Sequence, residues 1–208
     1  RNYLWLSTYK GIYLFKKRSH TLNRRFKVYN KADSTGVDVR INSLDIRDDG
    51  TFWFIAESQG IGCYESKTGV YQIYHNKEKN SLPKYLSISK FSRKNDHEYF
   101  VALQTSEPCI FNVNTKKYFP FAEKISAENM QNTSDIKTDV SGNLWVVVNY
   151  RLFIGQPNKK IFKTIPVHDI VYEDKIPKVL KNVLWDEEDK KYYAGFDLSD
   201  GVFVYDQH

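Results

Sequence analysis

The 208-residue sequence is poor in cysteine, with only Cys63 and Cys109. Two cysteines cannot build a disulfide-stapled scaffold, and the absence of C-x-x-C spacing argues against a structural zinc site. Both cysteines fall in predicted strands of different repeats, and a bridge requires Cα atoms within about 7 Å of each other. We therefore expect two buried free thiols, and cysteine usage leaves the cellular compartment open.

Long apolar runs are also missing. No stretch reaches the roughly 18–20 residues that a membrane-spanning helix needs, and no signal peptide is visible. The chain starts at Arg1 without an initiator methionine. We expect a piece of a longer protein whose contact with a membrane is made only by regions outside this sequence.

Charge of one sign is not concentrated anywhere. The net charge is +6, but lysine and arginine are interrupted by acids, as in residues 77–80 and 186–191. This pattern is typical of a solvated basic surface, and it carries no signature of nucleic-acid binding. Glycine and methionine are scarce while aromatic residues make up 15% of the chain, a composition that favours strands over helices.

What the sequence does contain is a repeat. An aromatic residue that follows a polar turn recurs at intervals of 48, 47, 45 and 48 residues; these anchors are Trp5, Trp53, Phe100, Trp145 and Tyr193. A fixed period of this length indicates a repeat architecture in which each copy is one supersecondary unit.

Each repeat reads as four strands. In the second repeat an alternating strand (39–46) is followed by a turn with Asp-Gly (47–51), a nearly continuous apolar strand (52–57), and a third strand (60–65). The fourth strand (70–75) is more polar, as expected at an edge. Asp-Gly suits a tight hairpin turn, and a continuous apolar strand indicates burial on both faces.

A four-stranded sheet of this size cannot cover its own two apolar faces, but stacking against copies of itself can. The sequence therefore predicts an all-β fold: a β-propeller segment of four-stranded antiparallel blades, about four to five of them, belonging to a larger propeller. We expect residues 1–208 to form one partial propeller, with blades at about 1–30, 39–75, 85–122, 134–167 and 179–208. The first blade lacks its first strand and the last lacks its fourth. The anchor tryptophans Trp5, Trp53 and Trp145 are expected in the packing between blades.

Two strings carry a resemblance to a known family. The pattern D-x-x-G-N-L-W (Asp139 to Trp145) and L-W-L-S-T-x-x-G-I-Y-L-F (Leu4 to Phe15) resemble the two-component-regulator propeller repeat, and residues 66–83 are similar to its last portion. The third and fifth repeats depart, since Tyr-Phe and Tyr-Tyr replace Leu-Trp and their turns lack glycine.

The resemblance implies the periplasmic sensor region of a Bacteroidetes hybrid two-component system, the ectodomain of an inner-membrane protein. In that family paired propellers precede an immunoglobulin-like domain, a membrane helix and a histidine kinase, and many members respond to glycan-derived oligosaccharides. The resemblance also implies an oligosaccharide ligand and a homodimer formed through the full ectodomain. Histidine kinase activity would reside in a C-terminal part outside this chain.

No catalytic constellation is recognisable in the sequence. The five histidines lie in predicted loops or at the terminus without metal-ligand spacing, and no nucleophile elbow or P-loop is present. We expect no catalytic residue, no metal site and no cofactor in this chain, which is therefore not expected to be an enzyme.

Binding residues are expected in the loops between second and third strands, which differ while the framework repeats. These loops offer aromatic faces and polar groups, the combination that a sugar requires. The candidate ligand-binding residues are Tyr9, Lys10, Glu57, Gln59, Glu107, Asn149, Tyr150, Arg151, Asp197 and Asp200.

Two other functions remain open from the sequence. One is a protein-interaction scaffold, in which loops or strand edges hold a partner. The other is a propeller glycan hydrolase or lyase, which needs acidic or histidine groups that converge near the centre of the propeller. The favoured expectation is a non-catalytic sensor module.

Overall fold

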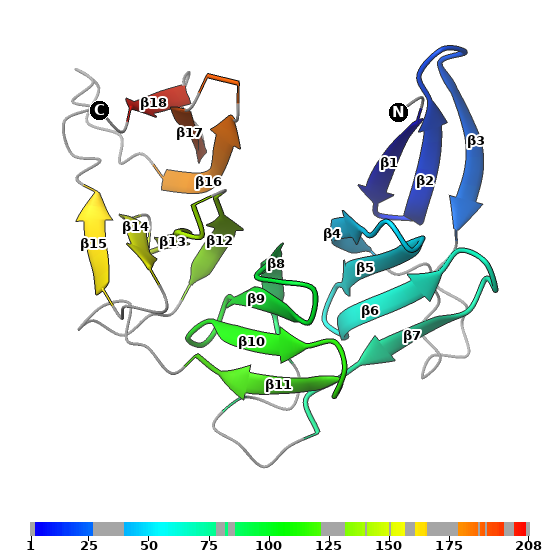
Figure 1. Ribbon diagram of the computed structural model, residues 1–208, viewed down its shortest axis with the longest axis horizontal. Helices are drawn as coiled ribbons and strands as arrows, with labels where there is room; N and C mark the ends of the chain where they lie inside the picture. Colours follow the sequence, from blue (N-terminus) through cyan, green and yellow to red (C-terminus); the bar gives the residue numbers. More distant parts are fainter. Residues whose placement is uncertain are drawn as a thin grey trace. The chain divides into compact units, whose positions relative to one another are not determined.

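The computed structural model describes residues 3–26, 40–77, 82, 86–121, 132–139, 141–149, 151–156, 161–165, 179–186, 188–189, 191–197 and 202–206. Every regular element in these ranges is a β-strand, and the strands form five antiparallel sheets. Within each sheet the strands lie side by side in sequence order (Figure 1). The chain divides into two compact units: Arg1–Lys77 with Pro83–Ile88, and Glu78–Leu82 with Ser89–His208.

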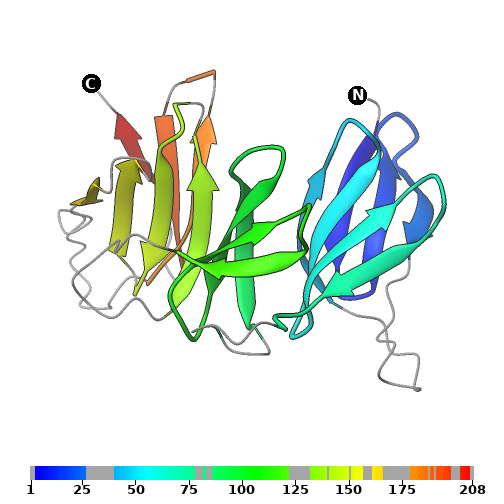
Figure 2. The same ribbon diagram turned by 60° about the horizontal axis from the view of Figure 1, so that its bottom comes forward.

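Unit 1 contains two sheets. The first has three strands, β1 (Tyr3–Thr8), β2 (Gly11–Lys16) and β3 (Thr21–Phe26). The second has four strands, β4 (Ile41–Ile46), β5 (Thr51–Ala56), β6 (Gly60–Glu65) and β7 (Tyr71–Tyr74), drawn as a fan of antiparallel arrows in Figure 2.

Unit 2 contains the other three sheets. Two have four strands: β8 (Ile88–Arg93), β9 (Glu98–Leu103), β10 (Cys109–Asn112) and β11 (Lys117–Pro120); and β12 (Thr133–Thr138), β13 (Leu144–Val148), β14 (Arg151–Gln156) and β15 (Ile161–Ile165). The last has three, β16 (Val179–Asp186), β17 (Lys191–Asp197) and β18 (Val202–Asp206). The predicted grouping into three, four, four, four and three strands is confirmed.

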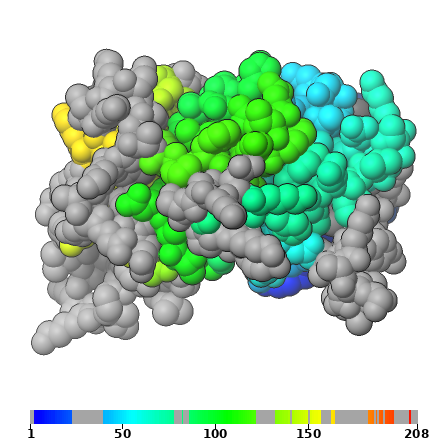
Figure 3. Space-filling model, turned by 90° about the horizontal axis from the view of Figure 1, so that it is seen from below, coloured from blue at the N-terminus to red at the C-terminus, as the bar shows by residue number. Residues whose placement is uncertain are grey.

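The outermost strand of a complete sheet faces solvent. Strands β7 and β11 each reach the surface in the space-filling view (Figure 3), and Phe119 of β11 is an exposed aromatic residue. Pro120 ends β11, where a residue without an N–H costs no ladder hydrogen bond on the open side. The more polar fourth strand predicted from the sequence is therefore an edge strand.

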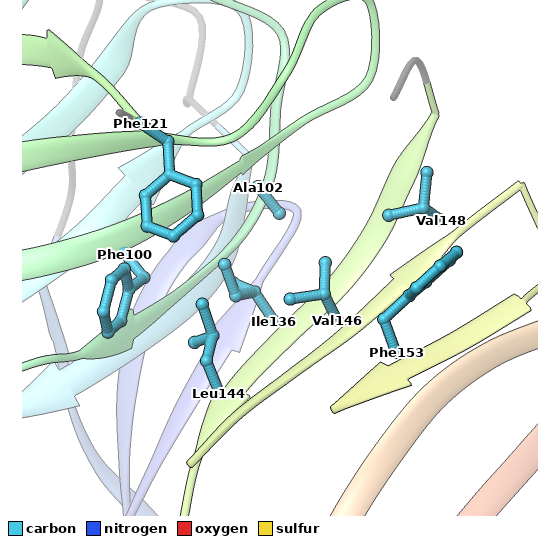
Figure 4. Packing of buried hydrophobic residues seen from close by; sticks show 8 residues of the cluster. All are labelled: Phe100, Ala102, Phe121, Ile136, Leu144, Val146, Val148 and Phe153. Atoms are coloured by element: carbon cyan, nitrogen blue, oxygen red, sulfur yellow. The ribbon is translucent and has the colours of Figure 1, made fainter. Parts of the chain in front are cut away.

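The second strand of a sheet is buried on both faces, as its continuous apolar sequence predicts. In β13, Leu144, Val146 and Val148 belong to one buried cluster with Phe100 of β9 (Figure 4). The alternate residues of β13, Trp145 and Val147, belong to a different cluster with residues of the sheet β16–β18. Because side chains alternate across a strand, one strand supplies the packing surface for two neighbouring sheets.

The anchor aromatic of one sheet meets the residue just before the anchor of the next sheet. In unit 1 the ring centroids of Trp5 and Phe52 are 4.3 Å apart. In unit 2 those of Trp145 and Tyr192 are 3.4 Å apart, with the rings stacked. Trp145 and Trp53 are buried, whereas Trp5 is half-buried against the cluster around Phe52. The expected packing between blades is confirmed for Trp5 and Trp145, whereas Trp53 is buried and its packing between blades stays a prediction.

At three of the anchors, the residue six positions earlier also contacts the anchor. Asp139 accepts a hydrogen bond from Nε1 of Trp145 at 3.0 Å. At the corresponding position Arg47 places its guanidinium carbon 5.6 Å from the Trp53 ring centroid. Lys94 places its ammonium nitrogen 5.5 Å from the Phe100 ring centroid. The residue at this turn position can thus contact the anchor with either sign of charge. A carboxylate accepts the indole N–H, whereas a cation lies over the face of the aromatic ring.

First strands of neighbouring sheets are joined by polar side chains in unit 2. The hydroxyl of Ser89 donates to the carbonyl oxygen of Thr133 at 2.6 Å. The carboxylate of Asp135 accepts the N–H of Val183 at 2.9 Å. These bonds satisfy groups that would otherwise be buried without partners, so they fix how β8, β12 and β16 line up.

Candidate binding site

The loops that the sequence singles out in unit 1 are the turn from β1 to β2 and the turn from β5 to β6. Tyr9 and Lys10 form the first turn, and Glu57 directly follows β5 in the second. Arg40, which the sequence analysis did not include among the binding residues, directly precedes β4. The side chain of Arg40 brings the two turns together.

Arg40 contacts both Tyr9 and Glu57. Its guanidinium carbon lies 4.0 Å from the centroid of the Tyr9 ring. Its Nη1 lies 3.4 Å from Oε1 of Glu57, and the N–H of Glu57 donates to the Arg40 carbonyl oxygen at 3.0 Å. We call these three residues the Tyr9–Arg40–Glu57 corner.

The corner is open to solvent. The ring of Tyr9 is 68% exposed, and the side chains of Arg40 and Glu57 are 41% and 45% exposed. Exposed ion pairs are worth about 0.2–1 kcal/mol and exposed cation–π contacts about 0.5–1 kcal/mol. The corner therefore holds its side chains in a defined arrangement while leaving their polar atoms within reach of a ligand.

Unit 2 has a corner with the same backbone bond. Asn132 directly precedes β12, Asn149 directly follows β13, and the N–H of Asn149 donates to the Asn132 carbonyl oxygen at 3.4 Å. The N–H of Asn132 donates in turn to the carbonyl oxygen of Gln104, which follows β9. The hydrogen bond of the corner is thus repeated, while its side chains change from arginine and glutamate to two asparagines, which have positive φ angles of 64° at Asn132 and 45° at Asn149.

The other predicted residues that the structure describes lie in the same two turns of unit 1, or in or next to loops of unit 2. Lys10 is exposed, and its N–H donates to the Thr8 hydroxyl. Gln59 is half-buried in the β5–β6 turn. In unit 2 the residues Glu107, Asn149 and Arg151 are exposed. Tyr150, Asp200 and the side chain of Asp197 lie outside the described residues.

A second polar group, buried in unit 2, surrounds Asp139. Its carboxylate accepts the N–H groups of Ser141 and Asn143, the indole N–H of Trp145 and the hydroxyl of Tyr192. Burial acts to raise the pKa of Asp139, but the hydrogen bonds outweigh it and place that pKa below the ordinary value. These bonds join the β12–β13 turn to the anchor tryptophan and to β17, so the network links two sheets of unit 2.

Asp135, also in unit 2, has the opposite electrostatic character. Burial raises the pKa of its carboxyl, and the N–H groups of Val183 and Ile136 only partly compensate. Among the described residues, no three His, Cys, Asp or Glu side chains converge so as to hold a metal ion. No helix long and apolar enough to cross a membrane occurs there either.

Solved structures with the same fold are known. The chain superposes on the extracellular domain of BT3049 from B. thetaiotaomicron, assigned as a hybrid two-component system, with a TM-score of 0.71 and 15% identity over 100% of this chain and 26% of that one. For the extracellular domain of BT4673 from the same organism the TM-score is 0.68, with 18% identity over 100% and 25%. PorZ, a surface component of the type-IX secretion system of Porphyromonas gingivalis, gives 0.65 and 12% over 98% and 31%.

These likenesses confirm the predicted fold class, a segment of a β-propeller, and the family resemblance at the level of the fold. The chain spans about a quarter of the length of the two B. thetaiotaomicron ectodomains. The sequence matches no protein-family model and no curated protein.

Proposed function

We propose that this chain is a non-catalytic, extracytoplasmic sensor module of a hybrid two-component system. It binds an oligosaccharide released from a glycan and passes the signal to a histidine kinase elsewhere in the full-length protein. The observation that carries the proposal is the fold shared over the whole chain with two extracellular domains assigned to such systems. The proposed location is the periplasmic side of an inner membrane.

The Tyr9–Arg40–Glu57 corner supports a binding role. It presents an exposed aromatic ring beside a cation and a carboxylate, and these groups come from two different sheets of unit 1. A sugar offers an apolar ring face and several hydroxyls, so it can use both kinds of group at once. Binding across two sheets would favour one relative arrangement of them, which is how a ligand shifts a conformational population.

Calorimetry tests the binding part of the proposal. A library of plant, host and microbial oligosaccharides is titrated into the 208-residue chain, and the same solutions are afterwards analysed by chromatography for cleaved products. We expect saturable binding of at least one oligosaccharide without turnover. Cleavage of the bound sugar would instead establish a propeller hydrolase or lyase.

The signalling part is tested in the full-length protein reconstituted in membranes. The oligosaccharide that binds should change the rate of kinase autophosphorylation, and an Arg40→Gln protein should need more ligand for the same response. A full-length protein that binds no oligosaccharide and whose kinase ignores the library would contradict the proposal.

A protein-interaction scaffold is the second candidate, favoured by the likeness to PorZ, which is a surface component of a secretion system. The two candidates differ in what elutes with the intact protein. A scaffold co-purifies with a stoichiometric protein partner whether or not sugar is present, whereas a sensor purifies as a single kind of chain, proposed to be a homodimer through the full ectodomain.

A further inference from the structure

We propose that the Tyr9–Arg40–Glu57 corner selects acidic sugars, specifically a uronic acid residue whose carboxylate pairs with Arg40 in place of Glu57. This inference rests on the proposed function, because it names the ligand class of that same site.

The hydrogen bond that closes the corner needs neither the arginine nor the glutamate side chain. The corner of unit 2 makes the same bond, from the residue after the second strand to the residue before the first, with asparagines at both positions. The side chains of Arg40 and Glu57 are also partly exposed, so the ion pair between them contributes little to stability. Their identity is therefore free to serve recognition.

Arg40 is held in a geometry suited to a carboxylate. Stacking on Tyr9 fixes the plane of the guanidinium group, and Glu57 engages only its Nη1, at 3.4 Å. A guanidinium group has five N–H donors in a planar fork that matches the two oxygens of a carboxylate. A ligand carboxylate that binds the fork with two short hydrogen bonds would improve on the long contact with Glu57.

Tyr9 supplies the surface for the sugar ring. With 68% of its surface exposed, Tyr9 is the most exposed large hydrophobic residue among the described residues of unit 1. Tyrosine offers an aromatic face for the C–H groups of a pyranose and a hydroxyl group for its oxygens. Lys10, the next residue, adds a second exposed positive charge. The corner thus combines a stacking face with a cation, and this combination favours an acidic sugar over a neutral one.

Glu57 acts as a resident competitor for Arg40. It belongs with Arg40 to the β4–β7 sheet, whereas Tyr9 belongs to the β1–β3 sheet. A uronate that displaces Glu57 would contact both Arg40 and the exposed part of Tyr9, and so would link the two sheets of unit 1. The predicted sign is distinctive: removal of the Glu57 carboxylate strengthens binding, whereas removal of the Arg40 charge weakens it.

The test uses matched pairs of probes at low salt. Trigalacturonate, trimannuronate and a hyaluronan tetrasaccharide are each titrated calorimetrically beside their methyl esters, which have the same shape without the charge. We expect at least one acid to bind, with its ester about tenfold or more weaker, as loss of a charge-assisted pair predicts. Failure of all three acids, or equal binding of acid and ester, overturns the inference.

Variants locate the site. Arg40→Gln should weaken binding of the acid about tenfold or more, and Glu57→Gln should tighten it about two- to fivefold, the worth of an exposed ion pair. Arg93→Gln removes an exposed charge of unit 2 and should leave the affinity for the acid unchanged. Unchanged circular dichroism and melting would show that the variants fold normally.

The outcomes separate this inference from the proposed function. If a neutral oligosaccharide binds and Arg40→Gln does not weaken its binding, the proposed sensor function stands but the acidic-sugar site is overturned. Weaker binding in Glu57→Gln means that Glu57 contacts the ligand, and it overturns displacement. If no oligosaccharide of any kind binds the chain, the proposed function falls together with the inference.

Discussion

Tyr192 of β17 donates a hydrogen bond to the carboxylate of Asp139, which lies 53 positions earlier in the turn between β12 and β13. The ring of Tyr192 stacks on Trp145, whose indole N–H donates to the same carboxylate. One buried group thus joins the turn of one sheet, its anchor tryptophan and the next sheet of unit 2.

Removal of the Tyr192 hydroxyl tests the energy of this contact. Tyr192→Phe keeps the ring but takes one donor from a buried carboxylate, and such bonds are worth about 1.5–3 kcal/mol. We expect the free energy of unfolding, measured by urea denaturation, to fall by about that amount. Tyr193→Phe is the control, because its hydroxyl reaches Asp189 on the exposed side and its loss should not be measurable. Equal effects of the two substitutions would contradict the assignment.

The pH dependence of stability should reflect Asp139. Its folded-state pKa lies below the ordinary value of 3.8, so the ionised form is favoured by folding. Its contribution is therefore complete above the unfolded pKa and is lost as the pH falls through the folded pKa. Asp139→Asn should be less stable than the parent at pH 7, and the difference should shrink below pH ~4. A difference that stays constant down to pH ~2 would refute this account.

The pKa of Asp135 should be shifted in the opposite direction from that of Asp139. Burial raises its folded-state pKa, so ionisation costs stability as the pH rises through that value. Carboxyl carbon NMR of the folded chain should find the pKa of Asp135 above that of Asp139, although both belong to the same repeat. Asp49, whose pKa is lowered chiefly by hydrogen bonds from Thr51, provides an exposed reference near the surface of unit 1.

Gly62 should tolerate no side chain. It pairs across β5 and β6 with Phe54, and a Cβ atom at Gly62 would lie 2.3 Å from the fully buried Phe54 ring. Gly62→Ala should lower the free energy of unfolding by about 1–3 kcal/mol or more through overpacking. Gly142→Ala is the control, because no atom lies within 4 Å of a Cβ atom added at Gly142. The cost of this substitution comes only from its φ of +76°, and we expect it to be about 1 kcal/mol. A larger loss at Gly142 would contradict this ranking.

The two thiols should differ in reactivity. Neither cysteine forms a disulfide, as predicted, but the prediction that both are buried is wrong for Cys63, which is half-exposed. Cys109 is buried, and burial raises the pKa of its thiol. A disulfide reagent at pH 8 should label one thiol per native chain, and mass spectrometry should locate it at Cys63. Both thiols should react after unfolding in urea. Rapid labelling of Cys109 in the native chain would mean that the β9–β11 region opens readily.

The strands and their grouping into sheets could be predicted from the sequence, because burial of a strand produces a regular pattern of apolar residues along the chain. The continuous apolar string of β13 predicts a strand covered on both faces, and its alternate residues do belong to two different clusters. The contact of Asp139 with Tyr192 could not be predicted, because the motif contains the aspartate and the tryptophan but Tyr192 comes from the next repeat. The repeat alignment selected Tyr193 as the anchor, and the buried partner is its neighbour Tyr192.

The candidate site was predicted in part. The loops containing Tyr9 and Glu57 were chosen because they vary, and both residues do contact one side chain, although their role in binding stays a prediction. Arg40 was missed because the alternating pattern of residues 39–46 placed it inside a strand, whereas β4 starts at Ile41. A single residue at the end of a strand decides whether a side chain belongs to the sheet or to the loop surface.

The contact between an anchor and the residue before the next anchor, as in Trp5 with Phe52, has a consequence for how such a chain can change over time. The repeat gives each sheet the same kind of packing face toward the preceding sheet and the same kind toward the following sheet. A stretch of about 47 residues can then be duplicated or deleted in one genetic event, and the flanking copies still meet compatible surfaces. Growth by whole modules is therefore easier for this architecture than insertion of a single strand.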